Sequence, residues 1–427
     1  MRSSRRAARS APDVRPRRAV GGPRRTPGGR GGIGLALAGG GFLGAAYELG
    51  VLAALAEAVP DLDLNALDAY VGVSAGSFIA AGLANGKTPH QMVRMFVEDA
   101  EDALDPATML RPSARLWLRA LRSAPQAFGQ ALDAGISEGL RGPRAVAWQA
   151  IERIGRLLPP GFLDTGPAER TLRALFAEEG RTDDFRRLRG ALRIVAADID
   201  TGEPVEFGAP GFDHVPISRA VLASSALPGL FPPVEIDGRF YVDGALNKTL
   251  HGSVALDEGV SLLLCVNPLV PYAGSAGRDA GAIARAGLPV ILSQSVRTAI
   301  RSRMGVGLQK YSVTHPDATI VLFEPRGDDA ATFFTSIFTV SSRRRVCEQA
   351  YQQTRADLLA RHDQYAARFE PFGLQLNRGV LEDRTLTLVR TTPPPLPRRP
   401  GGLEDTTLRL RHALDDLERT LKVSATS

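Results

Sequence analysis

Residues 33–50 read IGLALAGGGFLGAAYELG, and this stretch decides the fold. Residues 33–38 are apolar and short enough for a buried strand, and residues 45–58 continue as an apolar helix. The loop Gly39–Gly44 separates them, because each glycine of a triplet costs a helix about 1 kcal/mol. Length and apolarity alone would also fit a membrane span or a secretory leader. The glycines and Glu48 argue against both, so we expect a buried strand, a glycine loop and a buried helix.

Strand and helix patterns alternate along the chain that follows, which predicts an α/β fold. Further strands are expected near residues 71–73, 192–199, 205–207, 240–242, 261–266 and 319–323, and helices near residues 75–85 and 217–226. Residues 87–190 have a mostly helical pattern. This segment is a helical insertion that either covers the sheet or forms a lipid-facing cap.

Composition divides the 427 residues into three parts. Residues 1–32 are rich in Arg, Gly, Pro and Ser and lack aromatic residues, so we expect a disordered tail. Residues 33–375 form the α/β domain, with the insertion 87–190 inside it. Residues 376–427 form an extension with a Pro/Gly-rich linker and a charged amphipathic helix.

The charge of the chain is concentrated in the tail. The net charge is +6, but residues 1–30 carry ten Arg and one Asp, so the remaining chain is slightly acidic. This distribution argues against a nucleic-acid-binding domain, and the tail suits attraction to anionic lipid headgroups. With two Cys and no predicted leader or membrane span, we expect a cytoplasmic protein that associates peripherally with membranes. The sequence indicates no oligomeric state.

Residues 72–76 read GVSAG and fit the pattern G-x-S-x-G. Ser74 follows an apolar strand and precedes a helix of small residues, and Gly72 and Gly76 permit the sharp turn that exposes a nucleophilic hydroxyl. The helix N-terminus also places backbone amides beside any oxyanion that forms there. A serine that merely caps the helix is the alternative interpretation.

The glycine loop admits more than one interpretation. Successive amides of Gly39, Gly40 and Gly41 can point at one anion, as in an oxyanion hole or a phosphate loop. The loop also fits the dinucleotide pattern G-x-G-x-x-G, but the required acidic residue would be Asp61 or Asp63, which follow no clear second strand. A simple tight turn is the remaining alternative.

Residues 241–245 read YVDGA and place Asp243 at the end of a strand, before a glycine turn. A catalytic carboxylate of an α/β site occupies such a position, and so does an ordinary turn residue. Among the six His, only His251 lies near Asp243 in the sequence, and none has the context of a triad histidine. A carboxylate can itself accept the serine proton if it lies within hydrogen-bond reach.

Taken together, these segments resemble the patatin-like phospholipase family. The matching segments are residues 39–44, 72–76, 198–203, 223–233 and 243–245. The resemblance spans residues 33–325 and is strongest at 33–86 and 192–267. It implies a three-layer α/β/α sandwich, with the helical insertion after the helix that follows the nucleophile.

The resemblance also implies a site and an activity. Ser74 would be the nucleophile and Asp243 the general base, without a bound metal or cofactor. The implied oxyanion-hole residues are Gly39, Gly40, Gly41 and Ala75, and the motif glycines are Gly44, Gly72, Gly76 and Gly244. The substrates would be acyl esters of phospholipids, lysophospholipids or neutral lipids.

Two features depart from the family pattern. Leu43 stands where many members carry Lys or Arg, and residues 246–251 replace an Asn-Pro run. The first departure motivates an alternative, a weakly active or non-catalytic lipid-binding protein on the same fold. Besides the insertion 87–190, the apolar segment 333–338 is a second candidate for membrane contact.

Overall fold

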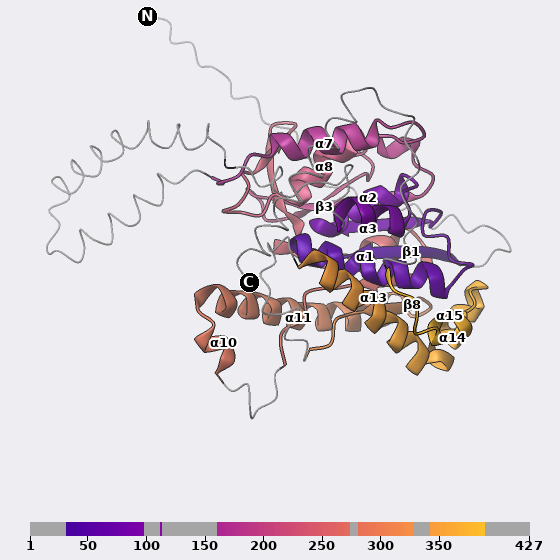
Figure 1. The fold of residues 1–427 in the computed structure, drawn as a ribbon. Coiled ribbons are helices and arrows are strands. Elements are labelled where there is room, and N and C mark those ends of the chain that lie inside the picture. The colour runs from indigo at the N-terminus through magenta and orange to yellow at the C-terminus, as the bar shows by residue number, and fades with distance from the viewer. Residues whose placement is uncertain (1–30, 98–111, 113–159, 274–280, 328–341, 389–427) are drawn as a thin grey trace, which may run out of the picture.

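The computed structural model describes residues 31–97, 112, 160–273, 281–327 and 342–388 (Figure 1). In this part of the chain, one mixed sheet of eight strands forms the centre of the fold, in the order β5-β6-β3-β2-β1-β7-β8, with β4 paired to β3. The strands are β1 (Gly32–Leu37), β2 (Ala69–Val73), β3 (Ala191–Asp198), β4 (Pro204–Phe207), β5 (Val234–Ile236), β6 (Arg239–Asp243), β7 (Val260–Val266) and β8 (Thr319–Phe323).

The direction of the strands decides which loops can meet. The neighbours β3, β2, β1, β7 and β8 are all parallel. Their carboxyl ends therefore lie at one edge of the sheet, where ligand sites of α/β folds are found. By contrast, β6 runs antiparallel to β3.

Alternate residues of β1 enter two separate hydrophobic clusters. Leu35 and Leu37 belong to one cluster, together with residues of α1 (Gly41–Ala58), α2 (Ala75–Ala84), α8 (Ile217–Ser224) and α13 (Arg343–Ala360). Ala36, and Ala38 just after the strand, belong to the other, together with residues of α9 (Gly252–Asp257) and α11 (Leu288–Thr314). Because successive strand side chains point to opposite faces, the two clusters lie on opposite sides of the sheet. The expected three-layer α/β/α sandwich is confirmed.

The remaining helices complete the two outer layers. They are α3 (Pro89–Phe96), α7 (Gly166–Phe176), α10 (Ala282–Arg285), α14 (His362–Phe369) and α15 (Arg378–Glu382), with short 3-10 turns η1 (Phe185–Arg187), η2 (Gly244–Leu246) and η3 (Glu370–Phe372). Figure 1 shows α13 lying along α1, and an added methyl group on Gly50 of α1 would come within 2.2 Å of the Cys347 carbonyl oxygen. Gly50 is therefore the point of close approach between these two helices.

Helix α1 has the length and mean hydropathy of a membrane span, with 78% of its residues buried inside the protein. Glu48 in this helix is fully buried, and the burial raises its pKa above the ordinary range. Packing of α1 against α13, α3 and α2 accounts for the burial of the helix. The helix therefore occupies the position of a core helix.

Four features differ from the sequence expectations. Helix α1 starts at Gly41 rather than at residue 45, so part of the glycine loop forms its first turn. The three-residue strand β5 and the long helix α11 were not predicted. The packed body also continues past residue 375, because Leu381 and Leu388 are buried in the larger cluster.

Apart from Pro112, the segment 87–190 is described only at its two ends. At the first end, Phe96 of α3 stacks on Phe42 with ring centroids 5.8 Å apart and lies equally close to Phe78. This end is therefore part of the domain core. Four predicted features lie outside the described residues: the cap over most of residues 98–159, the tail 1–30, the apolar segment 333–338 and the amphipathic helix near the C-terminus.

Candidate active site

Ser74 occupies a sharp turn between β2 and α2. Its backbone has φ 52° and ψ −123°, in a sparsely populated region that costs a non-glycine residue about 1–3 kcal/mol. Crowding explains the flanking glycines: a Cβ on Gly72 would lie 2.5 Å from Ser77 Cα, and one on Gly76 would lie 2.6 Å from the Ala38 oxygen. The turn brings Ser74 against the end of β1, as the G-x-S-x-G pattern predicts.

Side chains of two other serines hold this strained turn. Ser224 accepts a hydrogen bond from the Ser74 amide at 2.8 Å and donates its own proton to the Val195 carbonyl at 2.6 Å. Ser77 donates from its hydroxyl to the Ser74 carbonyl at 2.5 Å. Both the amide and the carbonyl of Ser74 therefore have buried partners, which leaves its own hydroxyl for chemistry.

Asp243 reaches Ser74 across an intervening strand. Val73, the residue before Ser74, pairs with Val195 of β3, and the next residue of β3, Ala196, pairs with Asp243. The chain after Asp243 passes directly over β3, because a Cβ on Gly244 would lie 2.3 Å from the Val195 oxygen. The glycine after the aspartate is therefore needed to bring this chain close to the sheet.

The Ser74 side chain lies close enough to the Asp243 carboxyl group to lower its pKa. The aspartate is only 3% exposed, and its Oδ1 accepts from the Ala245 amide at 2.9 Å. Burial raises the pKa of Asp243 from 3.8 to about 6, while Ser74 and Ala245 act in the opposite direction. The arrangement is that of an alcohol next to a base whose pKa lies near neutrality.

The glycine loop lies against this pair. A Cβ on Gly39 would be 3.1 Å from the Cβ atoms of both Ser74 and Ala245, so a side chain there would press these neighbours apart by a few tenths of an ångström. In this structure the Gly39 amide donates to the Thr249 carbonyl at 3.3 Å. Gly41 and Ala75 are the first residues of α1 and α2, so their amides have no acceptor one turn earlier in the helix. Together with Gly40, the N-cap of α1, they are the candidate oxyanion donors.

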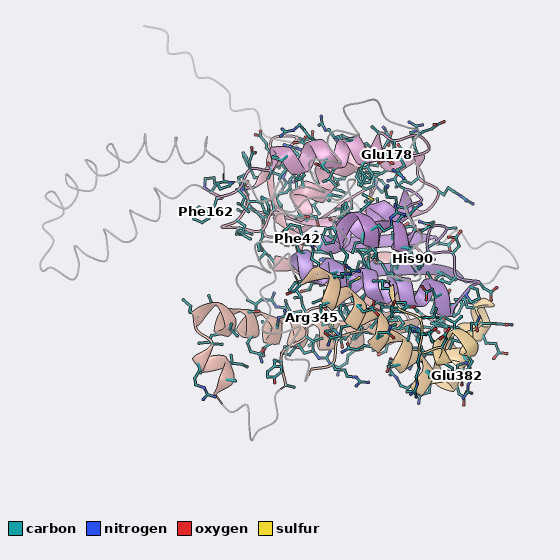
Figure 2. The ribbon with its side chains drawn as sticks, viewed as in Figure 1. Phe42, His90, Phe162, Glu178, Arg345 and Glu382 are labelled. Carbon is teal, nitrogen blue, oxygen red and sulfur yellow. The ribbon has the colours of Figure 1, made fainter. Side chains whose placement is uncertain are left out.

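Packing, rather than charge, holds the loop in place. A Cβ on Gly40 would lie 2.8 Å from both Gly44 Cα and Pro268 Cγ, and one on Gly44 would lie 3.1 Å from the same Pro268 atom. Leu43, which replaces the basic residue of many family members, is buried in the large hydrophobic cluster. Its neighbour Phe42 lies at the N-terminal end of α1 (Figure 2). The leucine therefore anchors the first turn of α1 in the core.

His251 supports the loop after Asp243 instead of contacting the carboxyl group. Its ring is buried beside the backbone of Gly244 and Lys248, and its Nε2 has no hydrogen-bond partner among the described residues. Burial, with a smaller contribution from the Lys248 charge, lowers its pKa to about 4, so the ring is neutral near pH 7. His251 thus helps to fix the turn that follows the candidate base.

The dinucleotide interpretation of the glycine loop does not fit the structure. Asp61 and Asp63 lie between α1 and β2, and Asp63 accepts a hydrogen bond from the Asn65 amide. Neither follows the second strand, where a ribose-binding carboxylate belongs. Among the described residues, no group of three or more His, Cys, Asp or Glu side chains is arranged to hold a metal ion.

Sequence reasoning did not assign a role to Ser224. The segment 223–233 was noted only for its resemblance to the family, and a serine in such a segment has no distinctive pattern. Its position on α8, facing both Val195 and Ser74, depends on the packing of this helix against β3. The role of Ser224 therefore follows from tertiary contacts and could not be predicted from local sequence.

Residues 35–250, half of the chain, match the family described as patatin-like phospholipase. The chain belongs to the patatin-like phospholipase family. The resemblance noted from the sequence motifs is confirmed, and the glycine loop, Ser74 and Asp243 all lie inside the matched residues.

Solved structures with detectable similarity include two bacterial proteins. VipD from Legionella pneumophila is 16% identical over 78% of this chain and 67% of its own, with a TM-score of 0.36. The type III effector protein ExoU is 19% identical over 80% of this chain and 58% of its own, with a TM-score of 0.33. ExoU also matches in its complex with SpcU from Pseudomonas aeruginosa, at 19% identity over 66% of this chain and 53% of its own, with a TM-score of 0.25.

Proposed function

We propose that this patatin-like protein is a serine-dependent acyl hydrolase that cleaves carboxylic esters of lipids. The observation that carries the proposal is the close approach of Ser74 to a buried carboxyl group, across β3, whose pKa is raised to about 6. A base with this pKa is largely ionised at pH 7 and can accept the proton of the attacking hydroxyl. The substrates we propose are phospholipids, lysophospholipids or neutral lipids.

The reaction proceeds through an acyl-enzyme. Asp243 accepts the Ser74 proton as the serine oxygen attacks the ester carbonyl, and amides of Gly40, Gly41 and Ala75 hold the oxyanion of the tetrahedral intermediate. Each such donor typically lowers the barrier by about 3 kcal/mol. Collapse of the intermediate breaks the ester C–O bond, and the leaving alcohol takes the proton from Asp243. Water then attacks the acyl-enzyme in the same way and releases the fatty acid.

A lipid-panel assay with mass-spectrometric identification of products tests this function. The intact protein is expected to release free fatty acid from at least one lipid class, and Ser74→Ala to reduce release to background. Ser77→Ala is the comparison variant: it removes one hydrogen bond to the Ser74 carbonyl but keeps the Ser74 hydroxyl, so it should retain measurable turnover. Equal turnover by Ser74→Ala and the intact protein would exclude Ser74 as the nucleophile.

The buried Leu43 favours a second candidate, a lipid-binding protein with little or no turnover. The loop has an apolar anchor in place of the basic residue of many family members. Such a protein would bind lipid without releasing product, and Ser74→Ala would leave the bound lipid unchanged. Product release that depends on Ser74 favours the hydrolase.

A further inference from the structure

Helix α11 has a buried face and an exposed face of contrasting character. Its buried and half-buried residues Ile300, Met304, Leu308 and Tyr311 face the second hydrophobic cluster or the groove beside it. Along part of the exposed side runs a stripe whose members follow one another at intervals of three or four residues, bordered by exposed polar residues such as Ser295, Ser302 and Gln309. We call these residues the α11 stripe: Leu288, Leu292, Val296, Ala299, Arg303, Val306, Lys310 and Val313.

The α11 stripe is exposed and largely apolar. Leu292, Val296 and Val306 are 55%, 57% and 67% exposed, and Val313 is 79% exposed. The solvent-facing side of a helix in a globular protein is normally polar. Figure 1 shows the beginning of α11, next to α10, at the margin of the molecule. The stripe is therefore an unpartnered apolar surface in the described part of the chain.

The charge of α11 indicates what kind of partner fits. Its 27 residues include Arg297, Arg301, Arg303 and Lys310 but no Asp or Glu. Arg301 pairs with Glu324, and Arg297 is buried, whereas Arg303 and Lys310 lie within the exposed stripe. A helix with an apolar face and basic side chains suits an interface that is apolar inside and anionic at its surface. The Arg-rich tail, residues 1–30, does not complement this charge.

The stripe is also connected to the candidate active site. Arg303 donates to the Leu246 carbonyl at 3.4 Å, and Leu246 lies three residues after Asp243 and is half exposed. The loop from Ala245 to Leu250 and the helix form the two walls of one groove. Contact along the stripe would therefore take place beside the loop that follows the candidate base.

We propose that the α11 stripe docks the protein on an anionic lipid bilayer, with the apolar side chains among the acyl chains and Arg303 and Lys310 at the phosphates. The inference deepens the proposed function, because a lipid hydrolase must reach substrate held in a membrane. Helix α11 would lie in the plane of the interface and bring the groove beside the loop 245–250 to the lipid surface.

Vesicle co-sedimentation of the full chain tests the docking surface. All proteins carry Ser74→Ala so that binding is measured without hydrolysis, on vesicles of phosphatidylcholine with and without phosphatidylglycerol. The triple variant Leu292→Ser, Val296→Ser, Val306→Ser is expected to weaken binding to anionic vesicles about tenfold or more. The double variant Arg303→Gln, Lys310→Gln is expected to weaken binding by about fivefold for each basic residue.

The matched control replaces two exposed apolar residues on the other half of the sheet, Ile199→Ser with Phe240→Ser. This control variant should bind the vesicles as tightly as the protein with the intact stripe.

Soluble-ester turnover separates this inference from the proposed function. With Ser74 intact, the triple variant should hydrolyse a short-chain p-nitrophenyl ester at the rate of the unaltered protein, which also shows that it is folded. The docking proposal would be overturned if the triple variant bound vesicles as tightly as the protein with the intact stripe. It would also be overturned if the protein with the intact stripe did not bind vesicles. The proposal would also be overturned if the unaltered chain formed a dimer, bound no vesicles, and lost its dimerisation in the triple variant. Absence of ester turnover in every form would instead contradict the hydrolase proposal.

Discussion

The hydroxyl oxygen of Ser224 lies 2.8 Å from the amide nitrogen of Ser74, although 150 positions separate the two residues in the chain. Ser224 also donates to Val195, so it links the turn at Ser74 to strand β3. The turn has a strained backbone at Ser74, and such strain persists only when surrounding contacts enforce it. Ser224 is therefore a positioning residue for the candidate nucleophile.

Ser224→Ala should lower the activity without unfolding the protein. Loss of the buried acceptor leaves the Ser74 amide unpaired, at a cost of about 1–3 kcal/mol. We expect kcat for a soluble ester to fall about tenfold or more, with little change in KM, because the geometry of attack is altered. Ser225→Ala is the matched control and should leave kcat unchanged. A loss confined to KM would show that Ser224 acts on substrate binding instead.

Gly244→Ala tests the passage of the chain over β3. An added methyl group would lie 2.3 Å from the Val195 carbonyl oxygen, so the loop and Asp243 must shift away from Ser74. We expect ester turnover near background and a lower thermal midpoint. Gly305→Ala is the control, because its methyl group would meet no atom within 4 Å and alanine favours a helix. Normal activity of Gly244→Ala would mean that the close approach is not required.

The raised pKa of Asp243 predicts the pH dependence of turnover. The carboxylate must be ionised to accept the serine proton, and its pKa is about 6. We expect kcat/KM for a soluble ester to rise about tenfold per pH unit below pH 6 and to level off above it. Buried His251 has a pKa near 4, too low to produce this step. A profile that is flat between about pH 5 and pH 7 would count against Asp243 as the base.

Asp243→Asn should stabilise the protein while abolishing turnover. Burial raises the pKa of this group from 3.8 to about 6 in the folded state. Between these values the unfolded chain loses its proton first, so the contribution of Asp243 to the free energy of unfolding falls as the pH rises. At pH 8 the buried ionised carboxylate carries the full cost, on the order of 1–3 kcal/mol, and at pH 3 it carries little.

Urea unfolding of the two proteins at pH 8 and pH 3 measures this effect. The asparagine introduced by Asp243→Asn can still accept from the Ala245 amide through its side-chain oxygen, so the turn should survive the substitution. The midpoint of Asp243→Asn should be the higher one at pH 8, and the difference should shrink at low pH. A lower midpoint at pH 8 would show that the ionised carboxylate stabilises the fold.

The sequence predicted the strand–turn–helix units because local rules determine them. Glycines at 39–41, 72 and 76 interrupt apolar runs at positions where only a tight turn fits, so β1, β2 and α2 were expected close to their observed positions. Helix α11 was not predicted because its β-branched residues, its two glycines and the exposed apolar stripe give no clear amphipathic pattern. Strand β5 has three residues and offers too little periodicity to detect.

The candidate site could be predicted in its residues but not in its geometry. The patterns around Ser74 and Asp243 mark both residues in the sequence, yet nothing local indicates that the chain crosses β3 at Gly244. The same holds for the Gly39 amide, which was expected to face the oxyanion and donates to Thr249 in this structure. The support from Ser224 and His251 also depends on contacts between distant segments.

Covalent labelling with a fluorophosphonate, followed by intact mass and peptide mapping, tests most directly whether Asp243 activates Ser74. We predict one adduct, on Ser74, that forms rapidly at pH 8, is absent from Ser74→Ala, and forms about a hundredfold more slowly or worse in Asp243→Asn. An adduct on another residue, or an equal labelling rate in Asp243→Asn, would contradict the account.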